Sequence, residues 1–158
     1  MRIMTDTNII ISAFLFPNSV IRKLLEKIVV QDQLILCPFI IEELYAVFKR
    51  KFPEEIDSLD FFLSELAFEL VYTPKRINVS DYPDIRDEND LPILVSAIMG
   101  EVDVFITGDK DFCDIPKILE TPYVLVENDD YRSPYLEEIR NFRNKTFEIS
   151  GILQYLSP

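Results

Sequence analysis

The chain has 158 residues, 48% of them hydrophobic and 28% charged, which excludes a disordered chain and predicts a single folded domain over residues 1–158. It has no histidine and two cysteines, which excludes imidazole catalysis, nitrogen-ligated zinc and a disulfide framework, and indicates a reduced cytoplasm. Residues 1–52 carry seven Lys/Arg against five Asp/Glu, net +2, and the remainder nine against 23, net −14, so bulk electrostatics disfavour nucleic-acid binding.

Short apolar runs and helical periodicities alternate along the first 72 residues. We expect strands at 2–4, 34–36 and 71–72, and helices at 9–16, 20–30, 38–48 and 54–70. Pro17 should end the first helix, Ser19 should cap the second, and Pro38 should open the third. The apolar face expected for that third helix is Ile41, Leu44, Tyr45 and Phe48.

The rest of the chain continues the alternation. Residues 73–86 are rich in Pro, Asn, Ser and Asp and predict a loop, after which Asp90 should cap a helix to about Met99. Further elements are expected as a strand at 104–106, a helix at 112–119, a strand at 123–126 and a helix at 152–156. Strands that alternate with helices predict a parallel α/β sheet, and no apolar run approaches the roughly 20 residues that cross a bilayer.

Four acidic segments are candidates for a shared site. They contain Asp6, Glu43, Asp87 with Asp90, and Asp109 with Asp111. Asp6 and Asp109 each follow an apolar strand, and ligands of open parallel sheets bind outside the carboxyl ends of the strands. Glu43 and Asp90 lie on helices that follow or flank this edge. Each residue also has a simpler explanation: Asp6 and Asp90 as helix caps, Asp109 as a turn residue and Glu43 as a solvent-facing side chain.

Clustered carboxylates require a proton or a cation. Two like charges about 4 Å apart repel by roughly 4 kcal/mol at an effective dielectric of about 20. Mg²⁺ and Mn²⁺ prefer oxygen ligands, and either ion can activate a water and stabilise charge on a phosphate oxygen. The site therefore suits phosphodiester hydrolysis without histidine. Nearby polar groups that can orient the carboxylates are Thr5, Thr7, Asn8 and Thr107.

Two basic patches stand out in the first third of the chain. One consists of Lys49, Arg50 and Lys51, and the other of Arg22, Lys23 and Lys27. Either patch could attract a phosphate polymer locally against the acidic net charge. A solvated helix face is the simpler explanation of both.

Four segments in order carry a family resemblance: Met4 to Asn8, Pro38 to Leu44, Arg86 to Ala97 and Val104 to Phe112. In order, spacing and flanking hydrophobicity they resemble the motifs of the PIN-domain family, and within it the VapC-like toxins of type II toxin–antitoxin systems. The resemblance covers about residues 1–115. It implies a PIN-like (Rossmann-like) three-layer α/β/α sandwich with a central parallel sheet, and a Mg²⁺- or Mn²⁺-dependent endoribonuclease that cleaves single-stranded RNA, mRNA or tRNA.

The resemblance also assigns roles by position. It implies a catalytic and metal-binding quartet for one or two ions, formed by Asp6, Glu43, Asp90 and Asp109. Supporting positions are Asn8, Asp87, Thr107 and Asp111. The family's toxins usually form homodimers and are blocked by a basic antitoxin segment, and we expect both kinds of partner here. Residues 120–144 depart from the family pattern and are expected to form an insertion.

Two alternatives remain open at this stage. A PIN-like scaffold could bind RNA or protein and cleave nothing, although all four acidic positions are occupied. A haloacid-dehalogenase-type phosphatase would use Asp6 as a phosphorylated nucleophile. Such a phosphatase needs a second aspartate two residues later, where this chain has Asn8.

Overall fold

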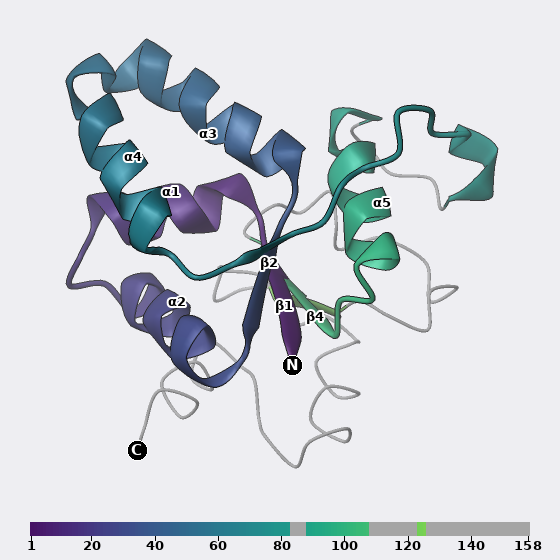
Figure 1. Ribbon diagram of the computed structural model, residues 1–158, viewed down its shortest axis with the longest axis horizontal. Helices are drawn as coiled ribbons and strands as arrows, with labels where there is room; N and C mark the ends of the chain where they lie inside the picture. The colour runs from purple at the N-terminus through teal and green to yellow at the C-terminus, as the bar shows by residue number, and fades with distance from the viewer. Residues whose placement is uncertain (83–87, 108–122, 126–158) are drawn as a thin grey trace.

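The computed structural model describes residues 1–82 and 88–107 and the backbone of residues 123–125 (Figure 1). Its strands are β1 (Arg2–Thr5), β2 (Gln33–Leu36), β3 (Glu69–Leu70), β4 (Val104–Ile106) and β5 (Tyr123–Leu125). Its helices are α1 (Thr7–Leu15), α2 (Val20–Gln31), α3 (Pro38–Lys51), α4 (Ile56–Glu65) and α5 (Leu91–Met99). Short 3₁₀ turns are formed by Pro53–Glu55, Val79–Asp81 and Glu88–Asp90.

The five described strands form one parallel sheet in the order β3-β2-β1-β4-β5. Met4 of β1 pairs with Ile35 on one side and with Phe105 on the other. Helices α1, α2 and α4 lie to one side of the sheet and α5 to the other (Figure 1). The predicted three-layer α/β architecture with a central parallel sheet is therefore confirmed.

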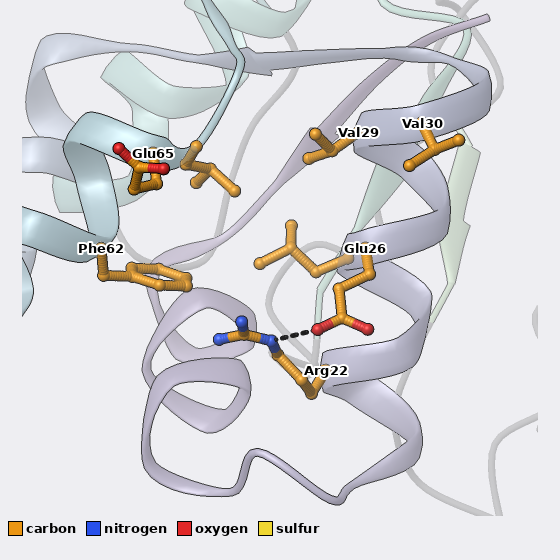
Figure 2. Close-up of a pocket in the computed structure, with 8 residues that line it drawn as sticks. Arg22, Glu26, Val29, Val30, Phe62 and Glu65 are labelled. Atoms are coloured by element: carbon orange, nitrogen blue, oxygen red, sulfur yellow. Dashed lines mark hydrogen bonds and ion pairs between the residues drawn. The ribbon is translucent and has the colours of Figure 1, made fainter.

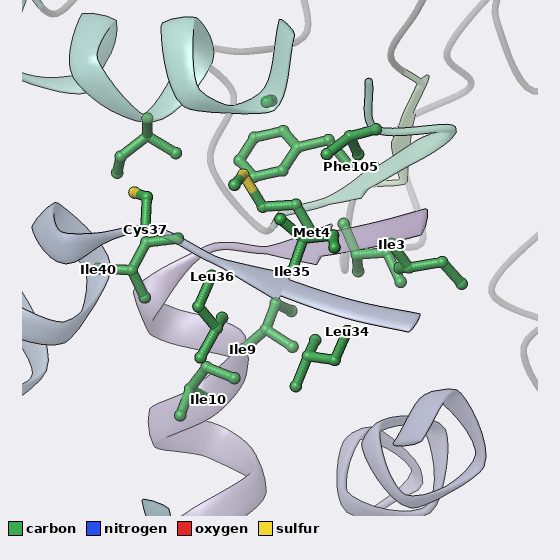
Figure 3. Packing of buried hydrophobic residues seen from close by; sticks show 14 of the residues in the cluster. Ile3, Met4, Ile9, Ile10, Leu34, Ile35, Leu36, Cys37, Ile40 and Phe105 are labelled. Atoms are coloured by element: carbon green, nitrogen blue, oxygen red, sulfur yellow. The ribbon is translucent and has the colours of Figure 1, made fainter. Parts of the chain in front are cut away.

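The core lies on both faces of the three central strands. Ile3, Met4 and all of Leu34 to Leu36 are buried, as expected for a parallel sheet that is covered by helices on both sides. Met4 packs beside Phe105, while Ile9 and Ile10 of α1 approach β2 from the opposite face (Figure 3). This packing fixes the sheet and the start of α1 relative to each other.

The first three predicted helices are confirmed as α1, α2 and α3, and the ends that differ from the prediction do so by one to three residues. Ser19 Oγ accepts a hydrogen bond from Arg22 N at 3.1 Å, so Ser19 caps α2 as predicted. The apolar face of α3 is rotated from the expected one. Ile40, Leu44 and Phe48 are its buried residues, whereas Ile41 and Tyr45 are only partly covered. The reason is that α3 packs against α1, α4 and α5, which leaves a wider half-buried margin than one stripe predicts.

The helix predicted over 54–70 was too long, and the strand predicted at 71–72 was displaced. A 3₁₀ turn precedes α4, the helix ends at Glu65, and Glu69–Leu70 forms β3 against Ile35 and Leu36. Arg2 clamps this strand through two 2.8 Å hydrogen bonds to the Glu69 carboxylate. Pairing with the β2 edge therefore outweighs the helical spacing that continues from Leu66 to Leu70.

Later predictions are tested only in part. The strand predicted at 123–126 is confirmed as β5, whereas the helices predicted at 112–119 and 152–156 lie outside the described residues. The single-domain prediction and the insertion at 120–144 stay predictions. Among the described residues no single helix is long and apolar enough to cross a membrane, and only α1 and α2 together, bent by 110°, reach that length and composition.

Candidate functional site

The strand order places the topological switch point of the sheet between β1 and β4. From β1 the chain builds outward through β2 to β3, and then returns to the other side of β1 to form β4. Ligands of open α/β sheets bind at such a switch point, outside the carboxyl ends of the strands. Asp6 follows β1 and Thr107 follows β4, and Asp6 N donates to Ile106 O at 3.0 Å. Two polar residues 101 positions apart thus meet at the switch point.

The two oxygens of the Asp6 carboxylate accept hydrogen bonds from different partners. Oδ1 accepts from Ile9 N at 2.8 Å, so Asp6 is the N-cap of α1. Oδ2 accepts from Thr107 Oγ1, and both side chains are buried. A cap needs only one acceptor, and an uncharged side chain serves nearly as well. The bond to Thr107 is therefore not explained by capping, and it orients the carboxylate at the edge of the sheet.

Glu43 is tied to the same edge through Thr7. Glu43 is exposed on α3, and its Oε2 accepts a hydrogen bond from the hydroxyl of Thr7, which is buried. Because Thr7 directly follows Asp6, this bond connects the second acidic segment to the first. Sequence reasoning named Thr7 among the polar groups that can orient carboxylates, but it did not identify Glu43 as its partner. The available signal was a hydroxyl at the first helical position after Asp6.

Asp90 directly precedes α5, which starts at the same end of the sheet as α3 and packs against it (Figure 1). Asp90 occupies the N-cap position, but its side chain makes no capping hydrogen bond and its backbone is already helical, with φ −86° and ψ −11°. The predicted capping role is wrong, because the 3₁₀ turn Glu88–Asp90 leads directly into the helix. Asp90 is half-buried, and capping does not account for its carboxylate.

The polar neighbours differ in what they support. Thr7 and Thr107 hold carboxylates as expected, whereas Asn8 is exposed in the first turn of α1. Thr5 Oγ1 does not orient a carboxylate, because it is buried and has no hydrogen-bond partner within the described part of the chain.

The side chains gathered at this edge offer oxygen atoms as metal ligands, which Mg²⁺ and Mn²⁺ prefer. Within residues 1–82 and 88–107, no three Asp, Glu or Cys side chains lie close enough together to hold a metal ion. Asp87, Asp109 and Asp111 lie outside the described residues. The structure thus links Asp6 and Glu43 to one edge through hydroxyl groups, and the complete quartet stays a prediction.

Thr107 offers a direct test of this arrangement. We expect Thr107→Val to lower the free energy of unfolding by about 1–3 kcal/mol, because the buried Asp6 carboxylate loses a donor. Thr107→Ser keeps the hydroxyl and is the matched control. Urea denaturation of both variants provides the measurement. Equal stability of the valine variant and the parent would show that the bond contributes nothing.

The two basic patches have different surroundings. Lys49, Arg50 and Lys51 are all exposed in the last turn of α3. In the other patch, Arg22 Nε donates to Glu26 at 2.7 Å and the guanidinium lies 5.2 Å from the centre of the Phe62 ring. Arg22 therefore packs between α2 and α4, which differs from the solvated helix face that was the simpler explanation of that patch.

Arg22 also borders an apolar groove of about 200 Å³ between α2 and α4. Figure 2 shows Val29 and Val30 of α2 on one side and Phe62 and Glu65 of α4 on the other. Val30 is 82% exposed at the border of the groove. The groove is thus a second candidate surface besides the acidic edge, and it lies on the side of the sheet that α2 and α4 cover.

The family model described as "PIN domain" matches residues 2–111, which is well over half of the sequence. The chain therefore belongs to the PIN domain family, a family of nucleases. This match includes all four segments that carried the resemblance apart from the last residue, Phe112.

A structural comparison agrees with this family. The chain is similar to a chain in the crystal structure of VapBC2 from Rickettsia felis bound to a DNA fragment from their promoter, with a TM-score of 0.61. The alignment covers 81% of this chain and 100% of the other, at 24% sequence identity. At this identity the likeness establishes the fold.

Short segments of the chain also match parts of longer curated proteins. Segments of 42 and 46 residues are 54% and 46% identical to parts of proteins named "Probable endonuclease 4" from Mesoplasma florum and Lachnoclostridium phytofermentans. They cover 27% and 28% of this chain, and only 13% and 15% of those proteins. Because the chain spans so little of these relatives, the matches do not transfer an activity.

Proposed function

We propose that this protein is a metal-dependent endoribonuclease that hydrolyses phosphodiester bonds of single-stranded RNA, and that it is the toxin of a toxin–antitoxin pair. One observation carries the proposal: the Asp6 carboxylate is held by Thr107 at the switch point of a PIN-domain sheet. Glu43, tied to the adjacent Thr7, adds a second carboxylate at the same edge.

Asp6, Glu43, Asp90 and Asp109 would hold one or two Mg²⁺ or Mn²⁺ ions, with Asp87 and Asp111 as acidic neighbours. When bound, such an ion lowers the pKa of a water molecule and stabilises negative charge on a phosphate oxygen. The chain's own hydroxyls prepare the ligands: Thr107 orients Asp6, and Thr7 orients Glu43. Because these hydrogen bonds already hold the carboxylates in place, the side chains lose less conformational freedom when an ion binds.

The acidic balance of the protein bears on how RNA would bind. A net charge of −12 repels a polyanion, so binding depends on local positive charge. Lys49, Arg50 and Lys51, exposed on the helix that carries Glu43, are placed to supply it. We infer that these residues attract the RNA backbone toward the acidic edge.

The alternatives differ in what they predict. A binding-only module would hold RNA or protein without cleavage, and would not require the charge of Asp6. The phosphatase alternative loses its basis, because the family match identifies a different class of enzyme.

The proposed partners follow from charge and from the structural neighbour. We infer that a basic antitoxin binds this acidic chain in the cytoplasm and that the protein forms a homodimer. The α2–α4 groove suits an amphipathic segment, because apolar side chains line it, and Glu65 at its border can pair with a basic residue, whereas Glu26 is already paired with Arg22. The structurally similar VapBC2 of Rickettsia felis is a complex bound to promoter DNA.

Cleavage of single-stranded RNA by the purified protein tests the proposal. We expect products with Mn²⁺ or Mg²⁺, and none with EDTA. Bound Mn²⁺ should also raise the melting temperature, since a ligand at about 100 times its Kd stabilises the native state by about 2.7 kcal/mol. A folded protein with no Mn²⁺-dependent shift and no cleavage of RNA pools, including total tRNA, would contradict the enzyme proposal.

A further inference from the structure

One exposed stripe of α3 combines three kinds of side chain. Phe39, Glu43 and Arg50 are separated by four and seven residues, so at about 100° per residue they lie within roughly 40° of one another around the helix. All three are exposed, and Phe39 is 41% exposed. The stripe runs for about 16 Å along the helix axis. We call these three residues the α3 stripe.

Each member has an ordinary explanation when it is considered alone. A single exposed phenylalanine is common on protein surfaces, and a basic residue in the last turn of a helix is favoured by the helix dipole. Lys49 and Lys51 share the second explanation, but they lie roughly 100° to either side of the stripe. Arg50 is the basic residue of this turn that lines up with Glu43.

The position of the stripe distinguishes it from other exposed side chains. Phe39 lies in the first turn of α3, directly after the carboxyl end of β2, and one turn before the glutamate that is tied to Thr7. Ala46 is exposed between Glu43 and Arg50, and its side chain is only a methyl group. Along the helix axis the exposed groups are therefore an aromatic ring, a carboxylate, the methyl group of Ala46 and a guanidinium.

These side chains match the two chemical parts of single-stranded RNA, its bases and its backbone phosphates. Aromatic side chains stack on bases without regard to sequence, and arginine contacts the backbone phosphates. We infer that single-stranded RNA lies along the α3 stripe, with a base stacked on Phe39 and a phosphate on Arg50. The strand thereby crosses Glu43 between these two contacts. This inference rests on the proposed function, since it names how the substrate of that site is held.

Binding measured without cleavage tests the inference. The probe is a fluorescein-labelled, mixed-sequence single-stranded RNA of about 12 nucleotides, within the usual site size of such proteins, titrated with the Asp6→Asn protein in Mg²⁺. In this background we expect Phe39→Ala to weaken binding about five- to tenfold, because it removes one stacking contact. Phe39→Trp should restore binding. A probe with abasic sites throughout should bind equally well whether or not the background also carries Phe39→Ala.

The arginine has its own signature in the salt dependence. Arg50→Gln should reduce the slope of log K against log salt by about 0.7, the value for one phosphate contact on a single strand. Matched controls on other helices are Phe61→Ala on α4, where the ring is 68% exposed, and Lys23→Gln on α2. Both controls should bind within about twofold of the parent and keep its salt slope, because neither residue lies on the stripe.

The outcomes separate the inference from the proposed function. Unchanged affinity of the Phe39→Ala variant, or equal losses in the Phe61→Ala control, would overturn the α3 stripe while leaving metal-dependent cleavage intact. An unchanged salt slope in Arg50→Gln would also contradict it. Absence of RNA binding by the Asp6→Asn protein, together with absence of RNA cleavage by the unsubstituted protein, would instead overturn the proposed function.

Discussion

Asp6→Asn is expected to abolish metal-dependent RNA cleavage while the protein keeps its fold. The loss should exceed the roughly 10- to 100-fold that is typical when a group that only orients a metal ligand is removed. The substitution keeps the shape of the side chain and removes its charge. Cleavage rates of the variant and the parent, measured with Mn²⁺ at equal concentrations of folded protein, provide the measurement.

The fold should survive because the structure allows an amide at this position. Asparagine is as good an N-cap as aspartate, so the acceptor for Ile9 N remains. The Thr107 hydroxyl can reverse its role and accept from the new amide, since a hydroxyl both donates and accepts. We therefore expect the free energy of unfolding in EDTA to stay within about 1 kcal/mol of the parent value.

Asp6→Ala is the matched comparison for the structural role. It removes the cap of α1 and the hydrogen bond from Thr107, so it should cost about 2 kcal/mol or more. If charge is what matters, both variants are inactive but only the alanine variant is unstable. An asparagine variant that cleaves RNA at the parent rate would contradict the metal-ligand role of Asp6.

The sequence predicted the central part of the fold because local and long-range signals agree there. The apolar runs of β1, β2 and β4 are buried, the Ser19 hydroxyl caps α2, and Pro17 lacks the backbone N–H that would continue α1. The prediction failed at Glu69 and Leu70, where a helical pattern continued past the end of α4. Only the edge of β2 and the clamp from Arg2 decide that these residues form a strand.

The candidate site was predictable as residue types but not as contacts. Carboxylates after strands indicated an acidic edge, and the parallel topology explains why Asp6 lies there. The partners could not be read from the sequence, because Thr107 is 101 residues from Asp6 and Glu43 is 36 residues from Thr7. The cap predicted at Asp90 failed for a local reason, since the preceding 3₁₀ turn already supplies helical backbone.

Phe48→Ala is expected to cause the largest loss of stability, about 3–5 kcal/mol of unfolding free energy. Phe48 is fully buried on α3, and its ring meets Phe14 of α1 edge-on, with the centroids 5.0 Å apart. Phe14 in turn meets Phe62 of α4 at 5.5 Å. Removing the ring at position 48 would leave a cavity where three helices meet. Most domains are stable by about 5–15 kcal/mol, so a large share of the total would be lost.

The same contact positions the candidate site, because it holds α3, which carries Glu43, against α1, which carries Thr7. Phe48→Leu fills most of the volume of the phenylalanine ring and should lower the free energy of unfolding by less than about 2 kcal/mol. This variant therefore stays folded and shows the effect of altered packing alone. Guanidinium denaturation measures both variants, and the exposed Phe61→Ala is the control with little expected effect. A Phe48→Ala protein as stable as Phe61→Ala would mean that α3 is anchored elsewhere. If instead the leucine variant is folded but cleaves RNA more slowly, the position of α3 over α1 sets the activity, as the bond between Thr7 and Glu43 requires.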